Sequence, residues 1–237
     1  MIQFHFIQII LRNRIKIRMK KLVRFDLDGT LLNTLNDLAD SVNYALTYYG
    51  MPVRTVEEVR SFVGNGIGML IKRAVPYYTD EAVIQEVLET FKVYYSSHCM
   101  DKTAPYVGIP EALKMLKDNG LRLAVVSNKI DHEVVRLVNH FFPDTFDEVV
   151  GERENVRRKP EPDSVNQVLS SLSIGRDEAV YVGDSDVDIA TAANASMDSI
   201  LVSWGFKGRT ALESYGAKVI VDVPREIPYV LLEQNVQ

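Results

Sequence analysis

Short apolar runs alternate along the chain with longer segments in which apolar residues recur at helical spacing. The runs occupy residues 22–25, 123–126, 149–150, 179–182, 200–202 and 219–221. Short continuous runs of this kind are typical of strands buried on both faces of a parallel sheet. The clearest helical face between them consists of Val165, Val168, Leu169 and Leu172. Strand and helix in repetition predict a doubly wound α/β fold with a mainly parallel sheet.

Residues 34–103 break this alternation, because they contain no comparable strand run. Two helical faces stand out there: Leu35, Leu38, Val42, Ala45, Leu46 and Tyr49 on the first, and Val83, Ile84, Val87, Leu88, Phe91, Tyr94 and Tyr95 on the second. We therefore expect an all-helical cap domain at residues 34–103, inserted into a Rossmann-like core formed by residues 19–33 and 104–237. Ligands of open α/β sheets bind beyond the carboxyl ends of the strands, so this insertion would cover the site.

Composition narrows the class of protein. With 46% hydrophobic and 25% charged residues, the chain matches an ordinary globular protein and not a collagen-like, coiled-coil or disordered one. Its one cysteine, Cys99, allows neither an intrachain disulfide nor a cysteine-rich zinc site. This usage indicates a reducing compartment, and we expect a cytoplasmic protein.

Charge is distributed unevenly. Residues 1–21 contain six basic residues and no acidic ones, which leaves 21 basic and 32 acidic residues, a net charge of −11, over residues 22–237. Such an acidic body repels a phosphate backbone, so we expect no nucleic-acid partner and no membrane partner. We interpret residues 1–18 as an extension outside the core, upstream of a true start at Met19. The alternative is a basic amphipathic segment for targeting or for a membrane surface.

Carboxylates follow two of the predicted strands. Asp26 and Asp28 come directly after the first, and Asp184 and Asp188 after the fourth. A single aspartate at a strand end is commonly a turn or an N-cap. Two clusters at one sheet edge, without histidine or cysteine, instead favour a hard cation such as Mg²⁺ together with a substrate phosphate.

Polar groups able to bind an anion follow other elements. Ser127 and Asn128 end the second run, where their hydroxyl, amide and backbone N–H groups could donate to an anion, although a Ser-Asn turn is an ordinary feature. Lys159 precedes a predicted helix start, where a positive charge is unfavourable to the helix dipole. We therefore expect Lys159 to pair with a negative group.

Four segments together resemble the motifs of the haloacid dehalogenase superfamily, in the same order and with suitable spacing. They are DLDGTL at 26–31, SNK at 127–129, KPEP at 159–162 and GDSDVD at 183–188. The helical insertion also stands where the helical-cap members of that superfamily carry theirs. One departure is Asn194-Ala195-Ser196-Met197, since relatives usually have a glycine before the methionine.

The resemblance implies a role for each motif residue. Asp26 would attack phosphorus and form an aspartyl phosphate, and Asp28 would serve as general acid and base. Mg²⁺ would be held by Asp26, Asp184 and the backbone carbonyl of Asp28. The transferring phosphoryl group would contact Ser127, the Asn128 backbone N–H and Lys159, and Asp188 would orient neighbouring groups.

The implied activity is that of a Mg²⁺-dependent phosphatase. Asp28 and Asp184 argue against dehalogenation, because a halide leaves without a proton. Phe62-Val63-Gly64-Asn65-Gly66, followed by Lys72 and Arg73, resembles the phosphoglycolate phosphatases, which predicts hydrolysis of 2-phosphoglycolate to glycolate and phosphate. Alternatives are a broad sugar-phosphate phosphatase or a phosphomutase of the same superfamily. An inactive receiver-like or binding protein is the alternative from another class.

The cap segment suggests a contact for the substrate carboxylate. Gly64, Asn65 and Gly66 could offer backbone N–H groups, and Lys72 and Arg73 could offer charge, if they point inward. The alternative is that the glycines form hinge turns and the two basic side chains are solvated. A small phosphorylated metabolite is the expected partner, and the protein is expected to be a monomer or a homodimer.

Overall fold

The computed structural model describes residues 20–232, and the expected extension at 1–18 lies outside them. Within that range one sheet contains six parallel strands in the order β5-β4-β1-β6-β7-β8. The strands are β1 (Leu22–Phe25), β4 (Arg122–Ile130), β5 (Glu148–Glu152), β6 (Ala179–Gly183), β7 (Asp198–Val202) and β8 (Ile220–Val221). Each predicted run overlaps one of them, which confirms the α/β fold with a mainly parallel sheet.

Helices cover both faces of this sheet. On one face Val23 and Phe25 pack toward α6 (Ile109–Asp118), α7 (Asp131–Phe141) and α11 (Glu226–Leu232). On the other face lie α8 (Asp163–Ser171), α9 (Asp186–Asn194) and α10 (Gly208–Ser214), and a short 3-10 turn, η1 (Arg176–Glu178), precedes β6. Successive residues of each strand point alternately to the two faces of the sheet, so both helical layers receive apolar side chains. Burial of each large aliphatic side chain stabilises the fold by roughly 1.5–3 kcal/mol.

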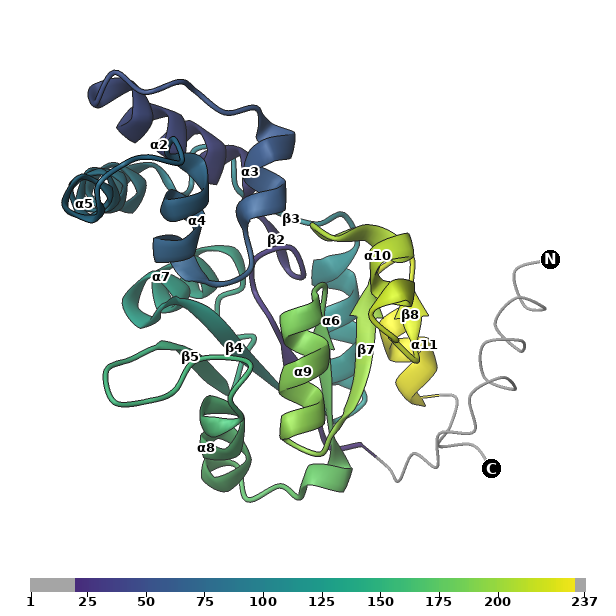
Figure 1. The fold of residues 1–237 in the computed structure, drawn as a ribbon. Coiled ribbons are helices and arrows are strands. Elements are labelled where there is room, and N and C mark those ends of the chain that lie inside the picture. The colour runs from purple at the N-terminus through teal and green to yellow at the C-terminus, as the bar shows by residue number, and fades with distance from the viewer. Residues whose placement is uncertain (1–19, 233–237) are drawn as a thin grey trace.

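The insertion is helical, as the spacing of its apolar residues predicts. It contains α2 (Leu35–Tyr48), α3 (Val56–Phe62), α4 (Gly66–Ala74) and α5 (Glu81–His98). Figure 1 shows these helices gathered together, apart from the sheet and the helices that flank it. The predicted faces of α2 and α5 are buried against each other, with Tyr49, Val83 and Tyr94 only partly covered.

Two short strands frame the insertion, and the sequence pattern did not predict them. β2 (Leu32–Asn33) pairs antiparallel with β3 (Ala104–Pro105). Beside them the buried Asp37 carboxylate accepts from the backbone N–H groups of Lys102 (2.9 Å) and Thr103 (2.8 Å). Two-residue strands have no periodicity, so only the folded chain reveals this connection.

In the turn after α9, Ser196 stands where relatives usually have a glycine before the methionine. Ser196 takes φ +54°, the left-handed conformation that glycine adopts readily. Its N–H donates to Ala193 and that of Met197 to Ala192, which together form a Schellman C-cap. The expected turn geometry is therefore retained by a serine under strain.

The chain topology fixes where a ligand site can form. β1 lies between β4 and β6, so the order of strands reverses at β1 and leaves a crevice at their carboxyl ends. The predicted functional residues of the core lie at or just after the carboxyl ends of these three strands, apart from Lys159, which lies in the loop after β5. No helix within residues 20–232 combines the length and apolar character needed to cross a bilayer.

Candidate active site

Asp26 is held at the carboxyl end of β1 by one of its two oxygens. Its Oδ1 accepts the Leu27 N–H at 2.7 Å and pairs with Lys159 Nζ at 2.9 Å. Among the described residues, Oδ2 makes no hydrogen bond or ion pair. This second oxygen is therefore available to react, while the first fixes the orientation of the carboxylate.

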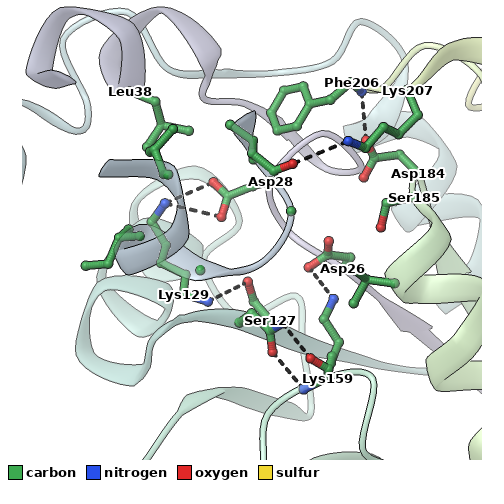
Figure 2. Close-up of a pocket in the computed structure, with 17 residues that line it drawn as sticks. Asp26, Asp28, Leu38, Ser127, Lys129, Lys159, Asp184, Ser185, Phe206 and Lys207 are labelled. Carbon is green, nitrogen blue, oxygen red and sulfur yellow. Dashed lines mark hydrogen bonds and ion pairs between the residues drawn. The ribbon is translucent and has the colours of Figure 1, made fainter. Parts of the chain in front are cut away.

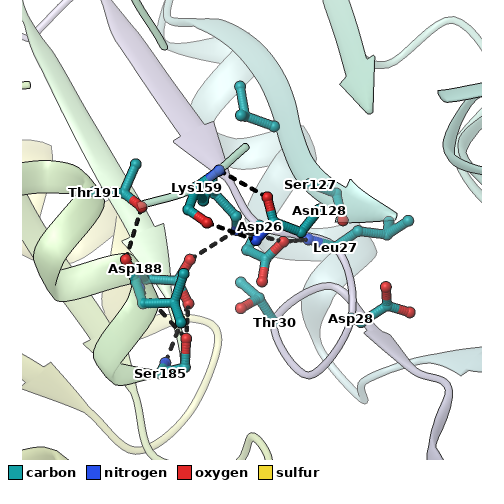
Figure 3. A network of polar contacts seen from close by, with 12 residues as sticks. Asp26, Leu27, Asp28, Thr30, Ser127, Asn128, Lys159, Ser185, Asp188 and Thr191 are labelled. Atoms are coloured by element: carbon teal, nitrogen blue, oxygen red, sulfur yellow. Dashed lines mark hydrogen bonds and ion pairs between the residues drawn. The ribbon is translucent and has the colours of Figure 1, made fainter. Parts of the chain in front are cut away.

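Lys159 is a buried cation shared by two aspartates. Its Nζ lies 2.9 Å from both Asp26 Oδ1 and Asp188 Oδ1 and donates to Tyr181 Oη at 3.1 Å. Burial alone would lower the pKa of Lys159, but the two carboxylates outweigh it and raise that pKa well above its usual value. The expected pairing of Lys159 with a negative group is thus present (Figure 3).

Asn128 positions Lys159 through the backbone. The Asn128 side-chain amide donates to the Lys159 carbonyl at 2.9 Å, and its Oδ1 accepts the Lys159 N–H at 2.8 Å. The Asn128 side chain is consequently committed to this contact. Ser127, next to it at the end of β4, lines the cavity together with Asn128 and Lys159.

Asp26 belongs to a cluster of three carboxylates. Asp26, Asp184 and Asp188 each place one oxygen within 4.8 Å of the others. Asp188 is fully buried, and its Oδ2 accepts from the N–H groups of Asp184 and Ser185 and from the Ser185 hydroxyl. Since its Oδ1 is used by Lys159 and Tyr181, Asp188 is suited to orienting its neighbours and not to binding a metal.

Asp184 is enclosed by glycines and by a loop that follows β7. Its Oδ2 accepts the Phe206 N–H at 2.7 Å, and the Thr30 hydroxyl donates to Oδ1 at 3.3 Å. A Cβ atom at Gly205 would lie 2.3 Å from the Asp184 Cβ, and one at Gly29, where φ is +83°, would lie 2.5 Å from Oδ2. Only glycine at these two positions leaves room for the carboxylate.

The electrostatics of the cluster fit a divalent cation. Burial raises the pKa of Asp26 to about 7 and that of Asp184 well above its usual range, and the neighbouring carboxylates add to both effects. The donor set consists of oxygen atoms, which suits a hard cation of the Mg²⁺ kind. Asp26 and Asp184 are the side chains able to hold it.

Asp28 points away from the cluster. Both of its carboxylate oxygens accept from Lys129 Nζ, at 2.9 and 3.2 Å. Lys129 also donates to Tyr95 Oη, 2.8 Å away on α5 of the insertion. Figure 2 shows the Asp28 carboxylate directed at Lys129, with Asp26 on the opposite side. Only the backbone of Asp28 is therefore left to contribute to a metal site.

The expected cap contacts divide into two groups. Gly64 and Gly66 line the cavity, where α4 begins, and Ile67 lies beside them. Asn65, Lys72 and Arg73 do not line it, and this corrects the expectation for them. Lys72 and Arg73 stand about 9 Å further along α4, since a helix rises about 1.5 Å per residue. Lys72 pairs with Glu81 at 3.2 Å, and Arg73 donates to the Phe62 carbonyl and to Asn65 Oδ1.

Sequence analysis missed several residues of the site. Lys129, Tyr95 and Lys207 were assigned no role, although Lys129 and Lys207 line the cavity. Lys129 belongs to the SNK segment after the run at 123–126, and Lys207 follows the run at 200–202, so both stand beyond the end of a predicted strand run. A lysine at such a position could have been predicted to lie in the site. Nothing in the helical pattern distinguishes Tyr95 from an ordinary core residue.

Comparison with known proteins shows the family. The chain belongs to the haloacid dehalogenase-like hydrolases, whose family model matches residues 23–202. It is 32% identical over 219 residues to phosphoglycolate phosphatase from Pseudomonas savastanoi pv. phaseolicola, covering 89% of this chain and 80% of that protein. It is 35% identical over 195 residues to phosphoglycolate phosphatase from Psychrobacter arcticus, covering 79% and 85% respectively.

Solved structures agree with this family. A crystal structure from Lactobacillus delbrueckii subsp. bulgaricus matches with a TM-score of 0.87 at 38% identity and covers 91% of this chain and 99% of that one. A predicted phosphoglycolate phosphatase from Haemophilus somnus matches with a TM-score of 0.84 at 29% identity, covering 90% and 98%. The protein is therefore an enzyme of the hydrolase class, similar to phosphoglycolate phosphatases.

Proposed function

We propose that the protein hydrolyses a small phosphate monoester, 2-phosphoglycolate, to glycolate and phosphate through a phosphorylated Asp26. The observation that carries this proposal is the contact pattern of Asp26, which has one oxygen anchored by Lys159 and Leu27 and the other free. The names of the relatives support the choice of substrate.

In the first displacement, Asp26 Oδ2 attacks phosphorus and the ester oxygen leaves. Ser127 Oγ–H, the Asn128 backbone N–H and Lys159 Nζ donate to the phosphoryl oxygens, which holds the group in line with Asp26. Asp26, Asp184 and the backbone carbonyl of Asp28 would hold Mg²⁺, which when bound would supply positive charge to offset the repulsion between carboxylate and phosphate. Asp188 keeps Lys159 and the start of α9 in place.

In the second displacement, water attacks the phosphorus of the aspartyl phosphate and the Asp26 carboxylate is restored. Asp28 gives a proton to the departing alkoxide and then accepts one from this water. While both its oxygens accept from Lys129, Asp28 has no proton to give. Proton transfer therefore requires the Asp28–Lys129 pair to separate when substrate is bound and Asp28 to take up a proton from the solvent before the alkoxide leaves.

The cavity favours a small substrate. It measures about 80 Å³, and the insertion lines it with Leu38 of α2, the turn at Val63 and Gly64, and the first residues of α4. We assign the helices of residues 34–103 the role of a cap that excludes water from the reaction. The buried thiol of Cys99 fits a cytoplasmic location.

A screen of small phosphate esters tests the proposal. Phosphate release is measured with and without Mg²⁺ for phosphoglycolate, ethyl phosphate, glucose 6-phosphate and nitrophenyl phosphate, and substrates are ranked by kcat/KM. We expect phosphoglycolate to rank first and activity to require the metal. A sugar phosphate in first place would contradict the substrate, and Mg²⁺-independent release would contradict the metal. Conversion of a sugar phosphate to its isomer would identify a mutase.

A further inference from the structure

Three lysines line the active-site cavity, and two of them are already neutralised. Lys159 pairs with Asp26 and Asp188, and Lys129 pairs with Asp28. Lys207 forms no ion pair with any carboxylate of the described residues. Its one hydrogen bond there runs from Nζ to the Val63 carbonyl at 3.4 Å, which is long for a charged donor. Lys207 thus brings an uncompensated positive charge to the cavity.

The backbone around Lys207 fixes where this charge lies. Lys207 follows Phe206, whose N–H holds the Asp184 carboxylate, so the loop after β7 is anchored at the metal-binding cluster. From there the Lys207 side chain reaches the turn between α3 and α4, where a Cβ atom added to Gly64 would lie 4.0 Å from Nζ. Gly64 therefore borders the ammonium group without covering it.

Lys207 and the expected phosphoryl site stand on opposite sides of the cavity. Figure 2 shows Lys207 and Phe206 on one side of the cavity, and Ser127 and Lys159 on the opposite side. A phosphoryl group bound at Ser127, Asn128 and Lys159 leaves the rest of a small ester pointing toward Lys207. Lys207, which is partly shielded from water, favours an anionic group on the part of the substrate that faces it. A hydrogen bond between charged groups is stronger in such a partly desolvated cavity than in water.

We propose that Lys207 binds a second anionic group of the substrate and so selects phosphate esters that carry a carboxylate close to the ester oxygen. This inference rests on the proposed function, since it assigns the remainder of the substrate to the wall opposite the phosphoryl site. The substrate carboxylate accepts from Lys207 Nζ in place of the Val63 carbonyl. Lys207 takes the role that the sequence pattern had suggested for Lys72 and Arg73, whose side chains lie outside the cavity.

Kinetic comparison of two esters tests the role of Lys207. Lys207→Met keeps most of the side-chain length and removes the charge. We expect it to lower the ratio of kcat/KM for phosphoglycolate to that for ethyl phosphate by about 10- to 100-fold, mainly through KM, which is the usual cost of losing a charged hydrogen bond. Lys207→Arg should restore most of that ratio. Lys72→Met, which removes a lysine that lies outside the cavity and pairs with Glu81, should leave both substrates as in wild type.

A binding measurement separates this inference from the substrate assignment. The probes are 3-phosphonopropionate, which has the charges of phosphoglycolate and no ester bond, and propylphosphonate, which lacks the carboxylate. Wild-type enzyme should bind the first more tightly as a competitive inhibitor, and Lys207→Met should lose that preference. If Lys207→Met keeps the preference, or weakens both inhibitors equally, Lys207 is not the carboxylate ligand. If the wild type prefers 3-phosphonopropionate but hydrolyses another anionic ester faster than phosphoglycolate, only the named substrate is wrong.

Discussion

Lys129 and Asp28 form a largely buried ion pair, in which one ammonium group contacts both carboxylate oxygens at 2.9 and 3.2 Å. Their side chains are only 7% and 17% exposed. The Asp28 carboxylate and the Tyr95 hydroxyl raise the pKa of Lys129 despite its burial, which by itself would lower it. Because Tyr95 belongs to α5, Lys129 links the helical insertion to Asp28, the proposed general acid and base.

Removing one partner of this pair should destabilise the fold more than removing both. Lys129→Met leaves a carboxylate without its cation and should lower the free energy of unfolding by about 3–5 kcal/mol. Adding Asp28→Asn should recover at least about 1 kcal/mol of that loss. Urea unfolding of the two single variants and the double variant measures the coupling. Tyr95→Phe, which removes one hydroxyl, is the control and should cost about 1 kcal/mol. Additive effects of the two substitutions would show that the pair contributes nothing.

Asp28→Asn should affect substrates according to their leaving groups. An alkoxide leaves only with a proton, so we expect kcat/KM for phosphoglycolate to fall by about 10²–10⁴-fold. Nitrophenolate needs little protonation, so its release in the first turnover should change far less. Stopped-flow measurement of nitrophenolate beside a phosphate assay gives both values. Equal losses for the two substrates would exclude proton donation by Asp28.

Metal binding should strengthen as the pH rises. The folded-state pKa of Asp26 is about 7, against 3.8 for an unperturbed aspartate, and that of Asp184 is raised in the same direction. Between these pH values the folded, metal-free protein holds more protons than the unfolded chain, so its stability is lost progressively as pH rises from about 4 to about 7. A cation must displace those protons.

Thermal unfolding measures this dependence. We expect the Tm increase caused by Mg²⁺ to be clearly larger at pH 8 than at pH 5.5, and Asp184→Asn to reduce it at pH 8. Arg73→Met, outside the cavity, should leave the Mg²⁺ effect unchanged. An equal or larger stabilisation at pH 5.5 would contradict a site built from these carboxylates.

The turn after α9 should become more stable with glycine. Ser196 is exposed and holds φ +54°, so Ser196→Gly removes the clash of a Cβ atom in the left-handed region. The gain is reduced by the greater freedom of glycine in the unfolded chain, and a net increase of about 0.5–1 kcal/mol in unfolding free energy is expected. Ser173, with the same φ of 54°, offers a second position for comparison. A loss of stability at Ser196 would show that its side chain contributes to the cap.

The sequence predicted the residues whose role depends on local position. The parallel strands are apolar runs. Asp26, Ser127 and Asp184 follow the ends of these runs and Lys159 precedes a helix start, and the topology brings these positions together. Side chains whose partners come from distant elements were not assigned. The contact of Lys129 with Tyr95, 34 residues earlier in the chain, depends on how α5 packs on the core.

The cap contacts show the same limit. Lys72 and Arg73 were assigned from their charge and their proximity to Gly66, but the direction of α4 places them away from the cavity. Lys207 faces it because Asp184 holds the preceding residue. Packing of distant elements thus decides which lysine points into the cavity, and the spacing of residues in the sequence does not predict it.

The proposed mechanism requires Asp26 to become phosphorylated during turnover. Enzyme mixed with phosphoglycolate and Mg²⁺ is quenched in acid within the first turnovers, digested, and examined by mass spectrometry. The account predicts one added phosphoryl group on the peptide that contains Asp26, with none in Asp26→Asn, whose turnover should fall by several orders of magnitude while its Tm shows an intact fold. Turnover of Asp26→Asn within tenfold of wild type, or a phosphoryl group on another residue, would contradict it.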